Sequence, residues 1–310
     1  MSLITSERLT KSFGPVKAID GISFDIHGGE IVGLIGPDGA GKTTLIRLLL
    51  GLLRPSSGRL RIKGIDTSKS PYQIRSFTAY MPQHFSLYGD LTVAENMRFF
   101  ADLYGIPAGD FEQKSVRLLS FSGLHPFRRR RAADLSGGMQ KKLALACNLF
   151  HTPDILFLDE PTTGVDPVSR RELWGLLLEL NSRGTTIVLS TPYMDEAQRC
   201  RRVGMMFEGR MTSMRTPDEL IKDMKGEVLE LVTDAPDARR VIGGMAGLKS
   251  AYPYGGSLHL VFEPGMGRAD EVKNRLRKLG IPFKNVRRTR PSFEDAFLDL
   301  VQLSGPRNEP

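Results

Sequence analysis

Residues 36–43 read GPDGAGKT, which matches the pattern G-x-x-x-x-G-K-[ST] of a phosphate-binding loop. The aliphatic run EIVGLIG at 30–36 precedes it and predicts a buried strand, and TTLIRLLLG at 43–51 follows it and predicts a helix. Glycines in such a loop let backbone N–H groups surround phosphate oxygens, and the helix N-terminus adds the positive end of its dipole. The stretch therefore predicts a nucleotide site between a strand and a helix of an α/β fold.

Each residue of this loop has an expected role. Lys42 is expected to bridge the β- and γ-phosphates of a nucleoside triphosphate, and the hydroxyl of Thr43 is expected to coordinate Mg²⁺. The expected ligands are therefore ATP or GTP together with Mg²⁺. The other residues expected to bind the nucleotide are Gly36, Pro37, Asp38, Gly39, Ala40, Gly41 and Thr44.

A second, acidic motif supports this interpretation. The run DILFLDE at 154–160 predicts another buried strand, and it ends on the adjacent carboxylates Asp159 and Glu160. Beside a phosphate-binding loop, Asp159 is expected in the coordination shell of Mg²⁺, and Glu160 is expected to polarise the water that attacks the γ-phosphate. A turn exposed to solvent is the alternative explanation for the two acids.

The pattern of apolar residues divides the chain into domains. Strand-like and helix-like runs alternate over 1–222 and predict an α/β domain, in which DPVS at 166–169 predicts a helix start. Within it, 84–150 is dominated by helical patterns and predicts a helical subdomain. Residues 225–303 contain two predicted strands and two predicted helices, which indicate a small α+β domain. The tail 304–310 is predicted to be flexible.

Composition narrows the class of protein. The 310 residues carry a formal net charge of +8, and 40% of them are hydrophobic, which is typical of a globular domain. No apolar run approaches the roughly 20 residues that span a bilayer, and the start MSLITSER lacks the pattern of a secretory signal. We therefore expect a cytosolic protein, with Cys147 and Cys200 as buried free thiols. The basic run FRRRR at 127–131 is either a solvated surface or a contact with phospholipid headgroups or a membrane partner.

The stretch LSGGMQ at 135–140 predicts a second anion site. Ser136 is a good N-cap, and Gly137 and Gly138 expose backbone N–H groups at a helix start. With GPDGAGKTT before it and ILFLDEP after it, LSGGM resembles the signature of ABC-type ATPases. The resemblance covers nearly all of 1–222. It implies a P-loop NTPase fold in which two ATPase domains hold two ATP molecules between them.

The resemblance implies further site residues. The three signature residues Ser136, Gly137 and Gly138 would contact the ATP that is held by the P-loop of the partner domain. Phe13, in KSFG, would stack on adenine, although packing in the core is the alternative for a single aromatic residue. Gln83, in YMPQ, would reach Mg²⁺ and the attacking water. Asp166, in TGVD, would lie at the interface of the two ATPase domains.

The same resemblance implies partners and a location. The segment 84–96 is rich in aromatic and apolar residues, and in the family this region receives a cytoplasmic helix of the membrane subunit; packing inside the helical subdomain is the alternative. The segment from Glu160 to Trp174 and the small C-terminal domain resemble ATPase subunits of bacterial multidrug-type exporters. The expectation is an ATP-binding subunit, peripheral on the inner face of the cell membrane, that works with polytopic permease subunits and not with nucleic acid.

One catalytic position departs from the family. Most members have histidine after Ser-Thr in S-T-x-Y-M-D-E, where it contacts the γ-phosphate, but this chain has Pro192 in STPY. The resemblance therefore implies that Lys42, Gln83 and Glu160 still support ATP binding while hydrolysis is weakened. A heterodimer with a second ATPase that carries the histidine is expected. A homodimer in which Glu160 suffices is the alternative.

Two other functions remain open at this point. A soluble ABC-type ATPase that acts on DNA or ribosomes would carry either a long coiled-coil insertion or two ATPase cassettes, and this sequence shows neither. A nearly non-hydrolysing, nucleotide-sensing regulatory subunit is compatible with Pro192. None of the motifs encodes the transported substrate.

Overall fold

The computed structural model describes residues 2–83 and 87–304, with side chains up to residue 300. The chain divides into two compact units, Met1–Met214 and Arg215–Pro310. Residues 84–86 of the predicted aromatic segment and 305–310 of the predicted flexible tail lie outside the described residues.

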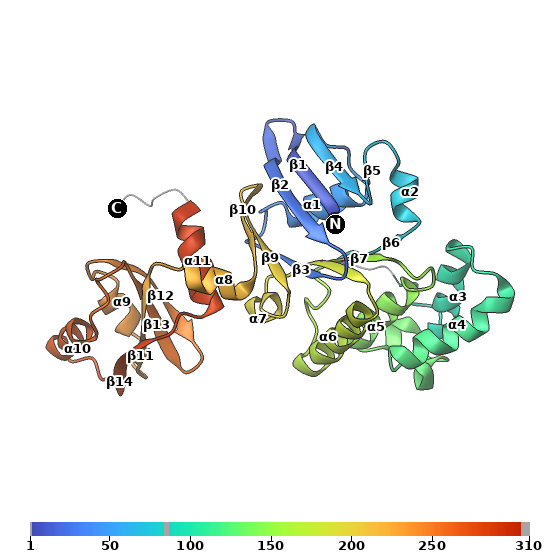
Figure 1. The fold of residues 1–310 in the computed structure, drawn as a ribbon. Coiled ribbons are helices and arrows are strands. Elements are labelled where there is room, and N and C mark those ends of the chain that lie inside the picture. The colour runs from blue at the N-terminus through green and yellow to red at the C-terminus, as the bar shows by residue number, and fades with distance from the viewer. Residues whose placement is uncertain (1, 84–86, 305–310) are drawn as a thin grey trace. The chain divides into compact units, whose positions relative to one another are not determined.

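A six-stranded sheet forms the centre of the first unit (Figure 1). Its order is β10-β9-β3-β8-β7-β6, and the pairs from β9 to β6 are parallel. Every residue of β3, β7 and β8 is buried, as expected for parallel strands that are covered on both faces. The strands are β3 (Ile31–Ile35), β6 (Thr78–Met81), β7 (Ile155–Asp159), β8 (Thr186–Ser190), β9 (Arg202–Phe207) and β10 (Arg210–Arg215).

An antiparallel sheet lies on one side of the parallel sheet, with helix α1 (Lys42–Leu49) between them (Figure 1). Leu45 and Leu48 of α1 belong to the same apolar core as Ile4 and Phe157, which lie in the two sheets. Burial of the apolar face of α1 on both sides therefore fixes the helix that follows the phosphate-binding loop. The order of this sheet is β2-β1-β4-β5. Its strands are β1 (Ser2–Phe13), β2 (Val16–His27), β4 (Ser57–Ile62) and β5 (Ile65–Asp66), and the short helix α2 (Pro71–Arg75) follows them.

A helical region with its own apolar core lies between β6 and β7. Its helices are α3 (Val93–Leu103), α4 (Ala108–Phe121) and α5 (Gly137–Cys147), and the 3-10 turns η1 (His125–Phe127) and η2 (Ala132–Asp134) connect α4 to α5. Thr92 and Glu95 cap α3 reciprocally, since each side chain accepts a hydrogen bond from the backbone of the other. The described part of 84–150 is therefore helical.

Helix α6 (Pro167–Ser182) covers the face of the parallel sheet opposite α1 (Figure 1). The Asp166 carboxylate accepts hydrogen bonds from the N–H groups of Val168 and Ser169, both at 3.0 Å, and Pro167 is the first helical residue. This start follows from a side-chain cap and from a proline whose missing N–H needs no partner there. A short helix, α7 (Met194–Ala197), follows β8.

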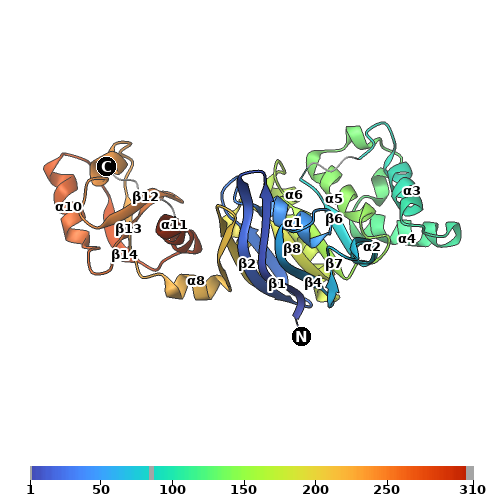
Figure 2. The ribbon, with the colours of Figure 1, turned by 90° about the horizontal axis from the view of Figure 1, so that it is seen from above.

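The second unit has a β-α-β-β-α-β chain order and a sheet of order β12-β13-β11-β14, which is a ferredoxin-like arrangement. Helices α9 and α10 pack on one face of this sheet, and α11 packs on the other (Figure 2). Helix α8 contacts α11, so the unit begins at Arg215, ahead of the boundary predicted between 222 and 225. Its elements are α8 (Pro217–Asp223), β11 (Glu227–Val232), α9 (Ala238–Ile242), β12 (Leu248–Tyr254), β13 (Ser257–Phe262), α10 (Ala269–Lys278), β14 (Asn285–Thr289) and α11 (Phe293–Ser304).

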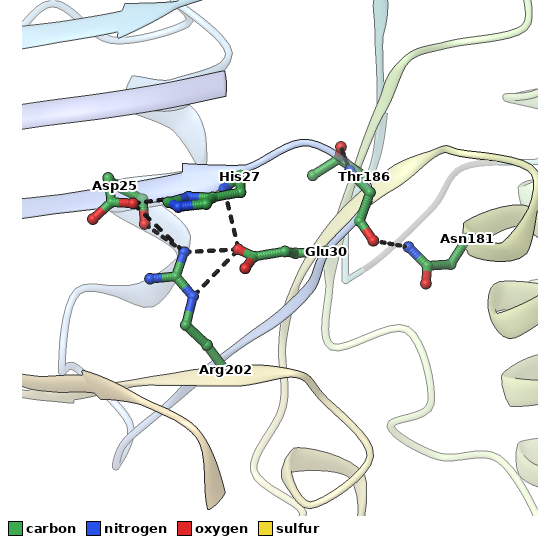
Figure 3. Close-up of polar contacts among 7 residues, drawn as sticks. Asp25, His27, Glu30, Asn181, Thr186 and Arg202 are labelled. Atoms are coloured by element: carbon green, nitrogen blue, oxygen red, sulfur yellow. Dashed lines mark hydrogen bonds and ion pairs between the residues drawn. The ribbon is translucent and has the colours of Figure 1, made fainter. Parts of the chain in front are cut away.

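A polar network fastens the turn between β2 and β3 (Figure 3). The Glu30 carboxylate accepts hydrogen bonds from Arg202 Nη2 at 2.7 Å and from the His27 N–H at 3.1 Å. The Thr186 hydroxyl accepts from the Gly29 N–H at 2.9 Å. Burial raises the pKa of Glu30, but the hydrogen bonds from Arg202 and His27 outweigh it, so the pKa lies below its ordinary value. The network therefore links the starts of β3, β8 and β9 to the end of β2.

Replacement of Glu30 by Gln tests this network. At pH 7 the variant should lose about 2 kcal/mol of unfolding free energy, since hydrogen bonds from a charged donor to a charged acceptor are lost. Because the pKa of Glu30 is lowered in the folded state, its contribution is complete above the pKa of an unfolded glutamate, about 4.3. It disappears as the pH falls through the lower folded value.

Urea unfolding at several pH values measures this effect. The difference between the original chain and Glu30→Gln should shrink as the solution is acidified below about pH 4. Asp25→Asn is the matched control, because Asp25 is more exposed and lies 3.7 Å from Arg202. Its change should stay below about 0.5 kcal/mol at pH 7. Equal losses in the two variants would contradict the assignment.

Candidate functional site

Parallel pairing brings the predicted catalytic segments to one edge of the sheet. Strands β3, β6, β7 and β8 run in the same direction, so their carboxyl ends lie together. The phosphate-binding loop follows β3, Gln83 follows β6, Glu160 follows β7, and Pro192 follows β8. Ligands of open α/β sheets bind at this edge.

The backbone of the phosphate-binding loop requires glycine at two positions. Gly36 has a φ of +155° and Gly41 a φ of +100°. A Cβ atom at Gly36 would lie 2.1 Å from the carbonyl oxygen of Met206, and one at Gly41 would lie 2.4 Å from the carbonyl oxygen of Ala18. The loop therefore packs directly on neighbouring backbone, and only glycine has both the space and the freedom of φ.

The amine of Lys42 lies inside this loop. Lys42 is 6% exposed, and its Nζ donates to the carbonyl oxygens of Gly36 at 2.8 Å and Pro37 at 3.0 Å. The first N–H groups of α1 have no partner within the helix and open at the same place. A buried ammonium beside a helix N-terminus fits the phosphates of a nucleotide.

A cleft of about 350 Å³ opens beside the loop. Gln83 and Glu160, which are far from the loop in sequence, line it together with loop residues. Ala18, which the sequence analysis did not select, lines it as well. The lining residues are Ala18, Asp38, Gly39, Ala40, Gly41, Lys42, Thr43, Thr44, Gln83 and Glu160.

The carboxylate of Glu160 is held by two side chains. Its Oε2 accepts hydrogen bonds from Gln83 Nε2 at 2.8 Å and from Thr163 Oγ1 at 3.1 Å. Its N–H donates to the hydroxyl of Ser190 at 2.9 Å. The φ of Glu160 is +47°, a left-handed conformation that costs a residue other than glycine about 1 kcal/mol. Neighbouring contacts thus hold Glu160 in a strained backbone conformation, which is common at catalytic residues.

Asp159 is buried beside Glu160. Its Oδ1 accepts a hydrogen bond from Ser190 Oγ at 2.5 Å, and Asp159 is 2% exposed. Burial and the nearby Asp159 carboxylate raise the pKa of Tyr80. Ser190 therefore connects two adjacent acids, since its hydroxyl donates to Asp159 and accepts from the backbone of Glu160.

The oxygen donors around the cleft are few and suit Mg²⁺ only together with phosphate and water. No group of three or more His, Cys, Asp and Glu side chains in 2–83 and 87–304 could hold a metal ion. The cleft offers the Thr43 hydroxyl and the Gln83 amide, and Asp159 lies at the carboxyl end of β7. Magnesium accepts few protein ligands when phosphates and water supply the rest, so these residues fit it in the presence of nucleotide.

The signature residues begin helix α5. The Ser136 hydroxyl accepts a hydrogen bond from the Met139 N–H at 3.3 Å, which is the predicted cap. A Cβ at Gly138 would lie 2.2 Å from the Cβ of Ser169 on α6, whereas one at Gly137 would meet nothing closer than 3.7 Å. Gly138 therefore permits α5 and α6 to pack, and Gly137 leaves backbone accessible.

A second cleft, of about 290 Å³, lies between the start of α5 and Gln83. Gly137 and Lys141 of α5 line it together with Gln83 and Gly164. Lys141 Nζ donates to the carbonyl oxygen of Gln83 at 2.7 Å. Burial lowers the pKa of Lys141, and the Glu160 carboxylate acts in the opposite direction.

Some predicted site residues lie outside the lining of the first cleft, among them Phe13, Asp166 and Pro192. Phe13 ends β1 and is 49% exposed, with Lys11 Nζ 5.0 Å from its ring centroid. Asp166 is exposed and caps α6, and these hydrogen bonds, above all that from Ser169, lower its pKa. Pro192 is exposed between β8 and α7. Each is accessible, but in this single chain none joins the group around Lys42 and Glu160.

The turn that contains Pro192 is held on both sides. Before it, the Thr191 hydroxyl donates to Glu196 Oε2 at 2.6 Å and accepts from the Tyr193 N–H at 3.1 Å. After it, Arg170 stacks on the ring of Tyr193 at 3.9 Å, and its Nε lies 3.7 Å from Glu196 Oε1. A fixed backbone therefore presents residue 192 to solvent.

Comparison with known proteins identifies the family. A family model described as "ABC transporter" matches residues 19–163. The daunorubicin resistance ATP-binding protein DrrA3 of Streptomyces coeruleorubidus is 33% identical over 307 residues, covering 96% of this chain and 95% of that protein. The chain belongs to the ABC transporter family. The probable multidrug ABC transporter ATP-binding protein YbhF of Escherichia coli K12 is 40% identical over 314 residues, covering 100% of this chain and 54% of that protein.

Solved structures agree with this membership in the ABC transporter family. The ATP-binding subunit of an ABC transporter superposes with a TM-score of 0.64 at 30% identity, covering 71% of this chain and 92% of that one. A nucleotide-free ATP-binding cassette gives 0.65 at 27% identity, covering 72% and 94%. The predicted fold class is confirmed. The chain spans about half the length of YbhF. Within the described residues, every helix is too short or too polar to cross a membrane.

The different surroundings of the two signature glycines give a test. Gly138→Ala should lower the unfolding free energy by about 1–3 kcal/mol, because its Cβ would overlap Ser169. Gly137→Ala should be neutral or stabilising by up to about 1 kcal/mol, since alanine favours a helix and its Cβ would make only an ordinary contact, 3.7 Å from the Gly164 carbonyl oxygen. Urea unfolding measures both. Ser169→Gly should recover part of the loss in Gly138→Ala, and an additive double variant would contradict this contact.

Proposed function

We propose that the chain is the ATP-binding subunit of an ABC exporter and that it couples ATP binding and hydrolysis to movement of membrane subunits. The observation that carries the proposal is the cleft in which Lys42, Gln83 and Glu160 meet. Relatives named for multidrug transport, daunorubicin resistance and Nod factor export favour an exporter over an importer.

The residues of the cleft support a mechanism for ATP hydrolysis in which each has a defined role. Lys42 and the N–H groups at the start of α1 bind the β- and γ-phosphates, and Glu160 orients and polarises the attacking water. Gln83 and Thr163 fix the Glu160 carboxylate, and Ser190 fixes its backbone. Ser136, Gly137 and Gly138 bind the ATP of a partner subunit, and Phe13 stacks on adenine. ATP is chosen over GTP on the basis of the family.

Mg²⁺ is the proposed cofactor. The Thr43 hydroxyl, the Gln83 amide oxygen and, through the first hydration shell or directly, the Asp159 carboxylate are its proposed ligands. When bound, the ion neutralises negative charge on the phosphates. Ser190 orients Asp159 for this purpose through the 2.5 Å hydrogen bond.

An exposed aromatic surface is the proposed permease contact. Tyr88 is 48% exposed and Phe99 39% exposed, and their ring centroids lie 4.6 Å apart, edge to face. Leu103 on the same helix is 66% exposed. Large apolar side chains exposed together favour a protein partner. This contact would place the subunit peripherally on the cytoplasmic face of the membrane, with no role for nucleic acid.

Pro192 supports a heterodimer with a second ATPase. It carries no polar group for a γ-phosphate, and its place after β8 is fixed by Thr191 and Tyr193. Loss of one positioned donor costs about 2.7–4 kcal/mol of transition-state stabilisation in a comparable case. The chain would then complete the site of a partner while its own site turns over slowly. A nearly non-hydrolysing regulatory subunit is the second candidate, which the same residue favours.

Pro192→His should restore hydrolysis. The φ of proline is open to any residue, so the turn should keep its shape. We expect the rate of phosphate release to rise at least about ten-fold, with the Kd for ATP changed by less than about two-fold. Lys42→Met is the control for binding and should lose nucleotide. An unchanged rate in Pro192→His would favour the regulatory role.

Affinity purification from detergent-solubilised membranes tests the partners. A tagged chain should recover a polytopic membrane protein and one further ATPase with histidine at the position of Pro192. Recovery of the membrane protein with two copies of this chain and no other ATPase would establish the homodimer instead. Loss of both partners after substitution of Tyr88 and Phe99 by Ser should follow if the aromatic surface is the contact.

A further inference from the structure

Lys141 occupies a special position on the signature helix. It lies one turn after Gly137 and Gly138, on α5. Its Nζ donates a hydrogen bond to the carbonyl oxygen of Gln83, the second residue after β6, at 2.7 Å. Both residues line the second cleft. No carboxylate in the described part of the chain forms an ion pair with Lys141. The Gln83 carbonyl oxygen is the acceptor for its ammonium group.

The contact continues to the catalytic carboxylate. The side chain of Gln83 donates from Nε2 to Glu160 Oε2 at 2.8 Å, while its backbone carbonyl accepts from Lys141. Gln83 is therefore held at its backbone by Lys141 of α5 and at its side chain by Glu160, the residue after β7. The Glu160 carboxylate also acts on Lys141, since it opposes the lowering of the Lys141 pKa by burial.

The adjacent lysine provides a contrast. Lys142 is also half-buried on α5, but its Nζ points to α6 and pairs with Glu172 Oε2 at 2.7 Å. Glu172 is exposed and lies away from both clefts. Two neighbouring lysines thus have similar burial, and only Lys141 contacts Gln83.

We propose that Lys141 is a positioning residue that transmits the placement of the signature helix to Gln83 and, through Gln83, to Glu160. This inference rests on the proposed ATPase function. When Ser136, Gly137 and Gly138 bind the nucleotide of a partner, α5 is held in place, and Lys141 then fixes Gln83 for hydrolysis in its own subunit. Each site of a dimer would in this way respond to occupancy of the other.

The experiment compares Lys141→Met, Lys141→Arg and Lys142→Met in the full chain. Methionine keeps the length and helix preference of lysine without its charge. The first readout needs no nucleotide: the side-chain amide signals of Gln83 in a ¹⁵N–¹H spectrum, assigned by their loss in Gln83→Met. Lys141→Met should shift these signals, whereas Lys142→Met should leave them in place.

The second readout is single-turnover hydrolysis of Mg²⁺-ATP beside the Kd of a fluorescent ATP analogue. Lys141→Met should hydrolyse at least about ten-fold more slowly, because small displacements of catalytic groups have large effects on rate. Its Kd should stay within about two-fold. Lys141→Arg should recover most of the rate, and Lys142→Met should resemble the original chain.

The outcomes separate this inference from the proposed function. Unshifted Gln83 signals in Lys141→Met overturn the inference whether or not the chain turns over ATP. Equal rate losses in Lys141→Met and Lys142→Met overturn it as well, since a general effect on α5 would explain them. Failure of the original chain to bind ATP counts against the proposed function alone. If Lys141→Met does not fold, Lys141→Gln carries the same expectation, because its side chain is shorter and uncharged.

Discussion

Parallel pairing of β3, β8, β7 and β6 is the constraint on which the site depends. It brings the phosphate-binding loop, Glu160 and Gln83 to one edge, although 118 positions of sequence separate Lys42 from Glu160. At the opposite edge, the network of Glu30, Arg202 and Thr186 joins the starts of β3, β8 and β9. These three strands are thus connected at their amino ends, and the carboxyl ends of β3 and β8 lead into the site.

Much of this site could be predicted from sequence because its parts are local. The phosphate-binding loop, the acids at the end of β7 and the cap of α6 each depend on residues within a few positions of one another. The sheets near the two ends of the chain are harder to predict from sequence. The antiparallel sheet of β1, β2 and β4 depends on pairings between distant segments, as do β12 and β14, and alternating patterns do not reveal their partners.

The connecting residues could not be predicted for the same reason. Ser190 is an ordinary polar end of a strand until pairing of β7 with β8 sets it beside Asp159. Lys141 is one of two lysines on a helix, and only the tertiary structure shows which one faces Gln83. Ala18 offers no polar side chain and lines the cleft through its place beside Gly41. The position of Ser190 at the end of an apolar run indicates the end of a buried strand, but it does not indicate which residues Ser190 contacts.

The left-handed backbone of Glu160 has a consequence for selection on this protein. Glycine at this position would remove the conformational cost and also the carboxylate, so under the proposed mechanism a gain in stability here would cost activity. Stability given up at Glu160 must be supplied elsewhere, and the buried core that surrounds α1 is large enough to do so. The strain at the proposed catalytic carboxylate therefore draws on the same stability margin as substitutions at remote core positions.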